Sequence, residues 1–393
     1  MKPEQQSDRR LIIGIDAGNT RSGGGLTYLT EMVRGAEPES IGIDKVVVWG
    51  NSATLAQLPE KAWLKRIHEP AHDGPFYEGF QWQARQLSAG AAVENCDLLF
   101  FPGSTYVGKF APFVAVSQNM LPFSPVERAR YGLSWTRARL KLLQYAQAKT
   151  FHRATGMIFL TQWAKLGIES YLRTNYRRAK IVPHGISERF RRDAVPQRPS
   201  SAFSMENPFR WLYVSIVAPY KHQWNVARAV ARLRTQGIPI TVDFVGPAYE
   251  PSARVLNETI KQLDPAGEFL WYRGAASYQE LHNYYHGADG FIFATTCENL
   301  PNILIEAMSA GLPIASSRFG PMPEVLGDGG LYFSPEDIGE TGEVLLRLFR
   351  DPELRRRCAE RAVIRASVYS WARCGNETFS FLGDIARLQR EKI

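Results

Sequence analysis

Two glutamates, Glu298 and Glu306, stand eight positions apart across a predicted strand–loop–helix junction. The apolar run 290–294 before them is typical of a buried parallel strand, and the next helix is predicted to begin near Pro301 and to stop before Gly311. The first N–H groups of a helix have no partner within it, so they can receive a phosphate. A carboxylate nearby can accept two hydrogen bonds from a ribose, which predicts a nucleoside diphosphate site. The residues predicted to line it are Asn299, Leu300, Pro301, Asn302 and Glu306.

The string 297–308 and the segments 308–317 and 320–325 after it resemble the donor site of the retaining family-4 glycosyltransferases (glycosyl transferases group 1). The resemblance is strong over about residues 205–372 and weaker from about residue 11. It implies an α/β chain of the GT-B fold, in which two Rossmann-like domains face across a deep cleft. It also implies a hexosyltransferase that moves a hexose-type sugar from a nucleoside diphosphate to a hydroxyl, with retention at the anomeric carbon.

Lys221 follows the apolar strand predicted at 211–215 and resembles the lysine that binds the donor diphosphate in that family. The resemblance therefore makes Lys221 and Glu298 the catalytic residues. Relatives often carry an arginine a few positions earlier, and none occurs here between Leu212 and Tyr220. Gly23, Gly24 and Gly25 follow the first predicted strand, where glycine lets backbone amides approach a diphosphate closely. These glycines are predicted to bind the donor as well.

Three residues of the first half are candidate contacts of the acceptor or the sugar. His184 stands where the family's Pro-Asn-Gly-Val turn has asparagine. Gln118 and Asn119 stand near a place where many relatives have a histidine or aspartate that touches the donor sugar. This departure weakens the case for a side-chain base, and in the family the departing phosphate oxygen is thought to take the acceptor proton.

The chain reads as two successive series of apolar strands and amphipathic helices, which is typical of parallel sheets covered on both faces. The Pro- and Ser-containing stretch 193–201 between them has the composition of a linker. We therefore expect a Rossmann-like acceptor-side domain over 1–195 and a donor-binding domain over 196–374. A C-terminal helix, about 375–393, is expected to pack back onto the first domain.

No Asp-x-Asp sequence occurs anywhere in the chain, so the usual metal-holding motif of glycosyltransferases is missing. Lys221 and helix amides could neutralise the departing diphosphate instead. We expect no metal and no cofactor other than the nucleotide sugar as co-substrate. The resemblance favours a donor of the GDP-mannose type. It implies an acceptor that is a glycan or lipid-linked glycan of cell-surface polysaccharide synthesis.

The net charge of +8 is concentrated in residues 120–195, which hold fifteen basic residues against four acidic ones. Within 128–153, arginines and lysines alternate with Trp135 and several leucines. This pattern predicts peripheral association with an anionic membrane, and a solvated helix face remains an equal interpretation. Nucleic acid is not expected, because no nucleic-acid-binding motif is present.

The four cysteines (Cys96, Cys297, Cys358, Cys374) are widely spaced, which favours a reducing cytoplasm over a disulfide framework. The N-terminus lacks the shape of a secretory signal, and no apolar run is long enough for a membrane span. We therefore expect a cytoplasmic protein, with the inner face of the plasma membrane as its peripheral site.

Two alternatives stay open. One is a sugar-nucleotide-binding protein without catalysis, which would fit the missing arginine and the Gln118-Asn119 departure. The other is a kinase of the actin-like fold, because Asp16, Gly18, Asn19 and Thr20 resemble that family's phosphate-binding turn. Such a kinase would also need further glycine-rich and acidic motifs downstream, and no convincing set is found.

Overall fold

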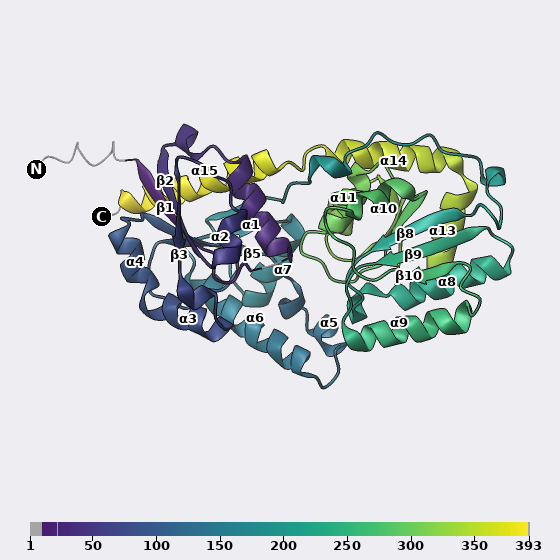
Figure 1. Ribbon diagram of the computed structural model, residues 1–393, viewed down its shortest axis with the longest axis horizontal. Helices are drawn as coiled ribbons and strands as arrows, with labels where there is room; N and C mark the ends of the chain where they lie inside the picture. The colour runs from purple at the N-terminus through teal and green to yellow at the C-terminus, as the bar shows by residue number, and fades with distance from the viewer. Residues whose placement is uncertain (1–9, 22, 392–393) are drawn as a thin grey trace, which may run out of the picture. The chain divides into compact units, whose positions relative to one another are not determined.

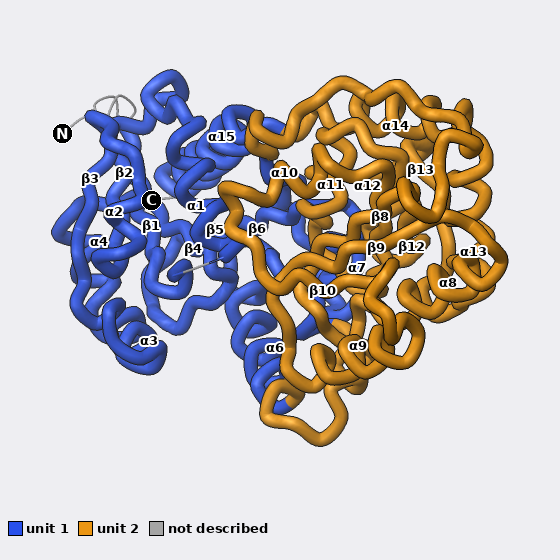
Figure 2. The backbone as a smooth tube through the Cα atoms, turned by 45° about the vertical axis from the view of Figure 1, so that its right-hand side comes forward, with its two compact units in different colours: residues 1–123, 138–185, 370–393 blue, residues 124–137, 186–369 orange. Residues whose placement is uncertain are grey.

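The structure is a computed structural model that describes residues 10–21 and 23–391 (Figure 1). Its chain divides into two compact units, residues 1–123, 138–185 and 370–393 in the first and 124–137 and 186–369 in the second (Figure 2). The N-terminal stretch used above to argue against a secretory signal, residues 1–9, lies outside the described residues. Within the described part of the chain, no helix is both long and apolar enough to cross a membrane.

The first unit is built on a seven-stranded sheet with the strand order β3-β2-β1-β4-β5-β6-β7 and parallel pairing throughout. Its strands are β1 (Leu11–Asp16), β2 (Ile43–Gly50), β3 (Leu64–His68), β4 (Leu98–Phe101), β5 (Phe113–Ser117), β6 (Gly156–Phe159) and β7 (Ala179–Ile181). Its helices are α1 (Gly23–Gly35), α2 (Ser52–Gln57), α3 (Phe76–Arg85), α4 (Leu87–Val93), α6 (Trp135–Arg153), α7 (Gln162–Leu172) and α15 (Trp371–Arg390).

The second unit is built on a six-stranded parallel sheet with the order β10-β9-β8-β11-β12-β13. Its strands are β8 (Phe209–Val214), β9 (Ile240–Val245), β10 (Leu270–Tyr272), β11 (Gly290–Phe293), β12 (Ile314–Ser317) and β13 (Gly330–Phe333). Its helices are α5 (Pro125–Ala129), α8 (Gln223–Thr235), α9 (Glu250–Leu263), α10 (Leu281–Gly287), α11 (Asn302–Ser309), α12 (Met322–Leu326), α13 (Ile338–Arg350) and α14 (Pro352–Ala366). A 3₁₀ turn, η5 (Glu188–Phe190), lies between α5 and β8 along the chain of this unit.

Both sheets follow from the apolar runs in the sequence, because strands such as β5 and β11 are buried along their whole length. The order of strands runs outward from β1 in one sheet and from β8 in the other, as in doubly wound folds. In both units the loops after the strands therefore emerge at one edge of the sheet, and Lys221 and Glu298 lie on two such loops.

The boundaries of the units differ from the predicted 1–195 and 196–374. The second unit already begins at Ile186, and it also takes in the segment 124–137. Arg130 of that segment pairs with Glu336, and Tyr131 lies edge-on to Tyr249. Composition could not reveal these pairings, because the partners stand more than a hundred residues along the chain.

The chain returns to the first unit at Ser370, and α15 packs against α1. The two helices approach through glycine: a Cβ at Gly35 would lie 2.8 Å from the carbonyl oxygen of Trp371, and one at Gly375 would lie 2.5 Å from that of Met32. Any larger residue at either position would push the helices apart. The helix expected from about residue 375 thus begins slightly earlier, at Trp371.

Candidate active site

The ammonium of Lys221 forms an ion pair with Oε1 of Glu298. Lys221 follows β8 and Glu298 follows β11, and these two strands are neighbours in the sheet. The lysine is 3% exposed, and its Nζ lies 5.2 Å from the ring centroids of both Tyr220 and Phe293. The two predicted catalytic residues are therefore in contact, inside a largely dry and aromatic surrounding.

Hydrogen bonds fix the loop of Lys221 to β8 and to the loop of Glu298. The hydroxyl of Tyr213 donates to the carbonyl of Lys221 at 2.5 Å, and the N–H of Thr296 donates to the carbonyl of Tyr220 at 3.0 Å. His222 lies 3.3 Å from the Thr296 hydroxyl through Nε2, and its backbone is left-handed with φ 52°. Burial lowers the pKa of His222 to about 4, with nearby Arg130 acting in the same direction. The imidazole is therefore neutral at pH 7 and serves as a hydrogen-bonding group.

Glu306 lies in α11, where the fold buries it to 5% exposure. Its Oε2 accepts a hydrogen bond of 2.8 Å from the hydroxyl of Tyr285 in α10. Burial raises the pKa of Glu306 to about 7, although the hydrogen bond from Tyr285 and the charge of Arg189 both act to lower it. Neither Tyr285 nor His222 was predicted, because nothing in the sequence pattern distinguishes them from core residues.

The helix α11 begins at Asn302, with Pro301 as its N-cap residue, one position after the predicted start. Asn299, Leu300 and Pro301 are buried, and Asn302 is half-buried. The first turn of α11 contains no acidic residue. The partial positive charge of the helix end is therefore left for an anion from outside the helix.

The glycine triplet, predicted to follow the first strand, forms the first turn of α1. Gly23 has φ +64°, which favours glycine there, and nothing lies within 4 Å of a Cβ built on Gly23 or Gly24. Gly25 would meet only the Thr20 methyl group, at 3.4 Å. The triplet thus combines a helix N-terminus with an open approach to its backbone.

The three candidate acceptor contacts have local partners in the first unit. His184 is 4% exposed, and its ring lies between those of Tyr28 and Trp371, at centroid distances of 4.6 and 5.7 Å. Gln118 donates to the carbonyl of Pro102 at 2.8 Å, and Asn119 accepts from the N–H of Leu121 at 2.9 Å. Each of these three side chains thus has a partner of its own within the first unit.

Asp16, the aspartate of the kinase-like turn, is 4% exposed. Its Oδ1 accepts from the N–H of Gly18 at 2.9 Å, and its Oδ2 accepts from the Gln83 side chain at 2.6 Å. Oδ1 thus closes the turn and Oδ2 ties it to α3. A Cβ at Gly18 would collide with the ring of His72 at 2.6 Å. This packing accounts for the Asp-x-Gly pattern without a bound phosphate.

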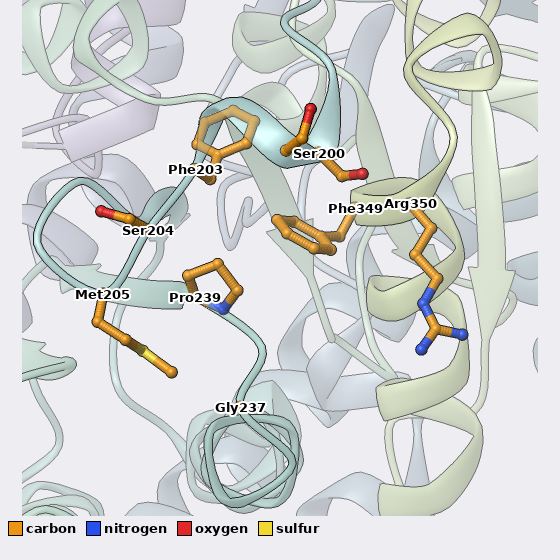
Figure 3. A pocket seen from close by; sticks show the side chains of 9 residues that line it. Ser200, Phe203, Ser204, Met205, Gly237, Pro239, Phe349 and Arg350 are labelled. Atoms are coloured by element: carbon orange, nitrogen blue, oxygen red, sulfur yellow. The ribbon is translucent and has the colours of Figure 1, made fainter.

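A separate pocket lies at the amino ends of β8 and β9, the opposite edge of the sheet from Lys221 (Figure 3). Phe203, Phe349 and Pro239 form its apolar wall, and Arg350 and serines stand around it. In the part of the chain that the structure describes, its lining includes none of the predicted site residues.

Residues 197–365 match the sequence model of the family described as Glycosyl transferases group 1. These residues form a group 1 glycosyltransferase domain. The ion pair of Lys221 and Glu298, the buried Glu306 and the start of α11 all lie within it.

Curated relatives match parts of the chain. MMP alpha-(1->4)-mannosyltransferase of Mycolicibacterium hassiacum is 38% identical over 164 residues, which are 41% of this chain and 39% of the relative. O-antigen chain mannosyltransferase B of Escherichia coli is 29% identical over 112 residues, 28% of this chain and 29% of the relative. The chain thus spans well under two thirds of the length of these relatives.

Solved structures match over almost the whole chain. Sucrose-phosphate synthase from Thermosynechococcus elongatus has a TM-score of 0.70 at 17% identity, with 98% of this chain and 99% of that chain covered. Anabaena HepE in complex with UDP-glucose has a TM-score of 0.67 at 16% identity, with coverage of 97% and 100%. The predicted fold class is confirmed: the group 1 domain and the first unit are the two Rossmann-like domains of a GT-B chain.

Proposed function

We propose that this chain is a glycosyltransferase that moves a hexose-type sugar from a nucleoside diphosphate to a hydroxyl of a glycan or lipid-linked glycan, with retention at the anomeric carbon. The observation that supports it most is the ion pair of Lys221 and Glu298 at the carboxyl ends of β8 and β11. Ligands of open α/β sheets bind beyond the carboxyl ends of the strands. A cation and a carboxylate held there match the two charges that develop when a sugar leaves a diphosphate.

Departure of the diphosphate is the difficult step, because negative charge grows on it while the sugar becomes positively charged. Lys221 and the first N–H groups of α11 would stabilise the diphosphate, since fixed donors cost no reorganisation during the reaction. Glu298 would hold sugar hydroxyls or stabilise the positive anomeric centre. The departing phosphate oxygen would take the acceptor proton on the same face. The contribution of Gly23, Gly24 and Gly25 remains a prediction of the sequence.

This assignment requires no metal ion, because Lys221 supplies the positive charge and no Asp-x-Asp sequence occurs in the chain. A neutral His222 beside Thr296 adds a dipole without a competing charge. The nucleotide sugar is the only co-substrate that the proposal needs.

The proposed donor is of the GDP-mannose type, and the proposed acceptor belongs to cell-surface polysaccharide. Two of the relatives are mannosyltransferases by name, and one of these acts on an O-antigen chain. A third, 29% identical over 201 residues, is a lipopolysaccharide 1,2-N-acetylglucosaminetransferase of Salmonella typhimurium. The sugars in these names differ, so the donor must be found by direct comparison.

The proposed membrane contact lies along α6, where Trp135, Arg139, Leu142, Tyr145 and Lys149 follow helical spacing. Trp135, Leu142 and Tyr145 are 75%, 64% and 69% exposed, and Arg139 and Lys149 are exposed as well. Such a mixture of apolar and basic side chains fits the interface of an anionic bilayer. The predicted segment 128–153 is wider than this face, because Arg130 is paired with Glu127 and Glu336 and Leu140 is buried.

A screen of donor hydrolysis over GDP-, UDP- and ADP-sugars, run in EDTA, tests the proposal. We expect the sugars of one nucleotide class to be hydrolysed slowly without acceptor. The Glu298→Gln and Lys221→Ala variants should hydrolyse them much more slowly than wild type. Binding of a nucleotide sugar without hydrolysis or transfer to any glycan acceptor would favour the sugar-nucleotide-binding protein. Loss of hydrolysis in EDTA that magnesium or manganese restores would contradict metal independence.

A further inference from the structure

Glu306 is held by a tyrosine that the proposed reaction does not use. The hydroxyl of Tyr285 lies 2.8 Å from Oε2 of Glu306 and 3.3 Å from the carbonyl oxygen of Ile303. Both Tyr285 and Glu306 are almost completely buried, at 0% and 5% exposure. A hydroxyl has one proton, and the shorter contact marks Glu306 as its acceptor.

The tyrosine ring has little freedom to move. It meets Phe190 of η5 edge-on, with centroids 5.5 Å apart and planes at 88°, and it lies 5.5 Å from Phe291 of β11 at 32°. The hydroxyl is therefore carried by an aromatic cluster drawn from η5, α10 and β11. Since the ring is fixed from two sides, the position of Oε2 is fixed with it.

A carboxylate offers about four lone-pair sites, and Tyr285 occupies one of them. The remaining sites suffice for two adjacent hydroxyls, but only while the carboxylate is ionised and correctly turned. Buried carboxylates lose ionisation unless a hydrogen-bond donor or a cation supports the charge. Tyr285 of α10 and Arg189 of η5 are the groups that give this support. The helices α12 and α14 also pack against α11, and no titratable group of theirs in the described residues acts on Glu306.

We propose that Tyr285 is a positioning residue for the ribose of a nucleoside diphosphate. Its hydroxyl holds one oxygen of Glu306, so that the carboxylate presents a fixed set of acceptors to the 2′- and 3′-hydroxyls. This inference rests on the proposed function, because it takes Glu306 as the group that binds the ribose. It adds that Tyr285 makes the site select ribonucleotides over 2′-deoxyribonucleotides. A site built to pair with a hydroxyl rejects the analogue that lacks it, because the buried acceptor is then left unpaired.

The test measures the affinities of UDP, GDP and ADP, and of their 2′-deoxy counterparts, for wild type and Tyr285→Phe by calorimetry at pH 6.5 and 8.5. We expect wild type to prefer the ribonucleotide at least about tenfold and Tyr285→Phe to reduce that preference at least about threefold. The affinity lost by the variant should be larger at pH 6.5, because a Glu306 without its donor holds its proton to higher pH. The nucleotide's own phosphate titrates equally with both proteins and cancels in the difference.

Two controls separate this role from a packing role. Tyr332 of β13 donates its hydroxyl to the Gly327 carbonyl at 2.6 Å. The Tyr332→Phe variant, which removes this hydroxyl, should bind the nucleotides like wild type at both pH values. In a Glu306→Gln background, Tyr285→Phe should change the preference for ribose no further. Unchanged preference and an unchanged pH dependence in Tyr285→Phe would overturn the proposal. Failure of wild type to bind any of these nucleotides would instead contradict the proposed function itself.

Discussion

The charged ends of Lys221 and Glu298 are each other's partner in the second unit, and the side chains are only 4% and 16% exposed. An incoming diphosphate would have to share or take over the ammonium that the carboxylate now holds. The pair thus links stabilisation of the departing diphosphate by Lys221 to stabilisation of the sugar by Glu298. A ligand that draws Lys221 toward phosphate releases Glu298 toward the sugar.

Replacing Glu298 by glutamine should separate binding from turnover. The ammonium of Lys221 loses its anionic partner, so a nucleoside diphosphate should bind more tightly than to wild type, since it no longer competes with a carboxylate. Hydrolysis of the donor should fall at least about tenfold, about 1.4 kcal/mol, because the support of the positive sugar is lost. Calorimetry with the nucleotide and a hydrolysis assay give the two numbers. Weaker nucleotide binding together with normal hydrolysis would mean that the pair only stabilises the fold.

Replacing Lys221 by alanine should lower kcat/KM by a factor equivalent to about 2–4 kcal/mol of transition-state stabilisation. The estimate is by analogy with the loss of one preorganised donor to a developing negative charge. The upper part of this range is expected, because no arginine stands between Leu212 and Tyr220 to share the charge. Steady-state kinetics with the true donor measure the loss. Turnover within about threefold of wild type would show that another cation stabilises the diphosphate.

Glu306 should make stability depend on pH. Burial raises the folded-state pKa of this carboxyl from the ordinary 4.5 to about 7. Well below pH 4.5 this carboxyl is neutral in the folded and unfolded chains, and its contribution to the free energy of unfolding is most favourable. As pH rises to about 7, the unfolded chain releases the proton first, so stability is lost, by about 3 kcal/mol for a shift of this size. Glu306→Gln should lack this loss.

Thermal unfolding of ligand-free wild type and Glu306→Gln from pH 4.5 to 8 measures the difference. The stability of the variant relative to wild type should rise between pH 4.5 and about 7. Above that pH the difference between the two proteins should stay constant. Parallel curves would show that Glu306 keeps an ordinary pKa in the folded chain. The same variant should lose at least about tenfold in kcat/KM for the donor, mainly through KM.

Arg355 of α14 should be a large contributor to the stability of the second unit. It is 0% exposed, and its guanidinium donates to the carbonyls of Leu348 and Phe349 at the end of α13 and to that of Arg198 in the linker. Arg355→Leu would leave these buried acceptors unpaired and should cost about 2–4 kcal/mol. Thermal unfolding gives the effect.

A neighbouring arginine provides the control for that measurement. Arg356 on the same helix is solvent-exposed and pairs with Glu353 and Glu360. Because exposed ion pairs contribute little to stability, Arg356→Leu should leave the midpoint of thermal unfolding almost unchanged. Equal effects of the two substitutions would contradict the role of Arg355 as a link between linker and helix.

The exposed face of α6 should bind anionic vesicles at low salt. Basic residues near such a surface contribute about 1 kcal/mol each, and the attraction is screened as the Debye length falls from about 10 Å at 0.1 M to 3 Å at 1 M salt. An Arg139/Lys149→Glu double variant, which reverses the charge of the two basic residues of this face, should fail to co-sediment yet keep donor hydrolysis. Wild type that ignores anionic vesicles at low salt would show that the face is only solvated.

The sequence predicted the parts of the fold that depend on local pattern. The apolar runs located β5, β8 and β11, and Pro301 placed the start of α11 to within one residue. It also named Lys221 and Glu298, because the segments that carry them resemble the donor site of the family and each follows a predicted strand. It could not predict Tyr285 or His222, since their roles come from contacts across the fold with Glu306 and Thr296. The segment 124–137 was misplaced for the same reason.

The packing of α15 against α1 has a consequence for synthesis on the ribosome. The apolar face of α1, with Met32 and Val33 fully buried in the folded protein, is synthesised long before the helix at 371–390 that covers it. Pairings this distant along the chain form slowly. The whole sequence of the second unit is synthesised before α15. The second unit can therefore fold while the face of α1 that α15 will cover is still exposed. A ribosome that stalls after residue 369 would leave a chain whose second unit can fold while α1 of the first unit lacks its cover.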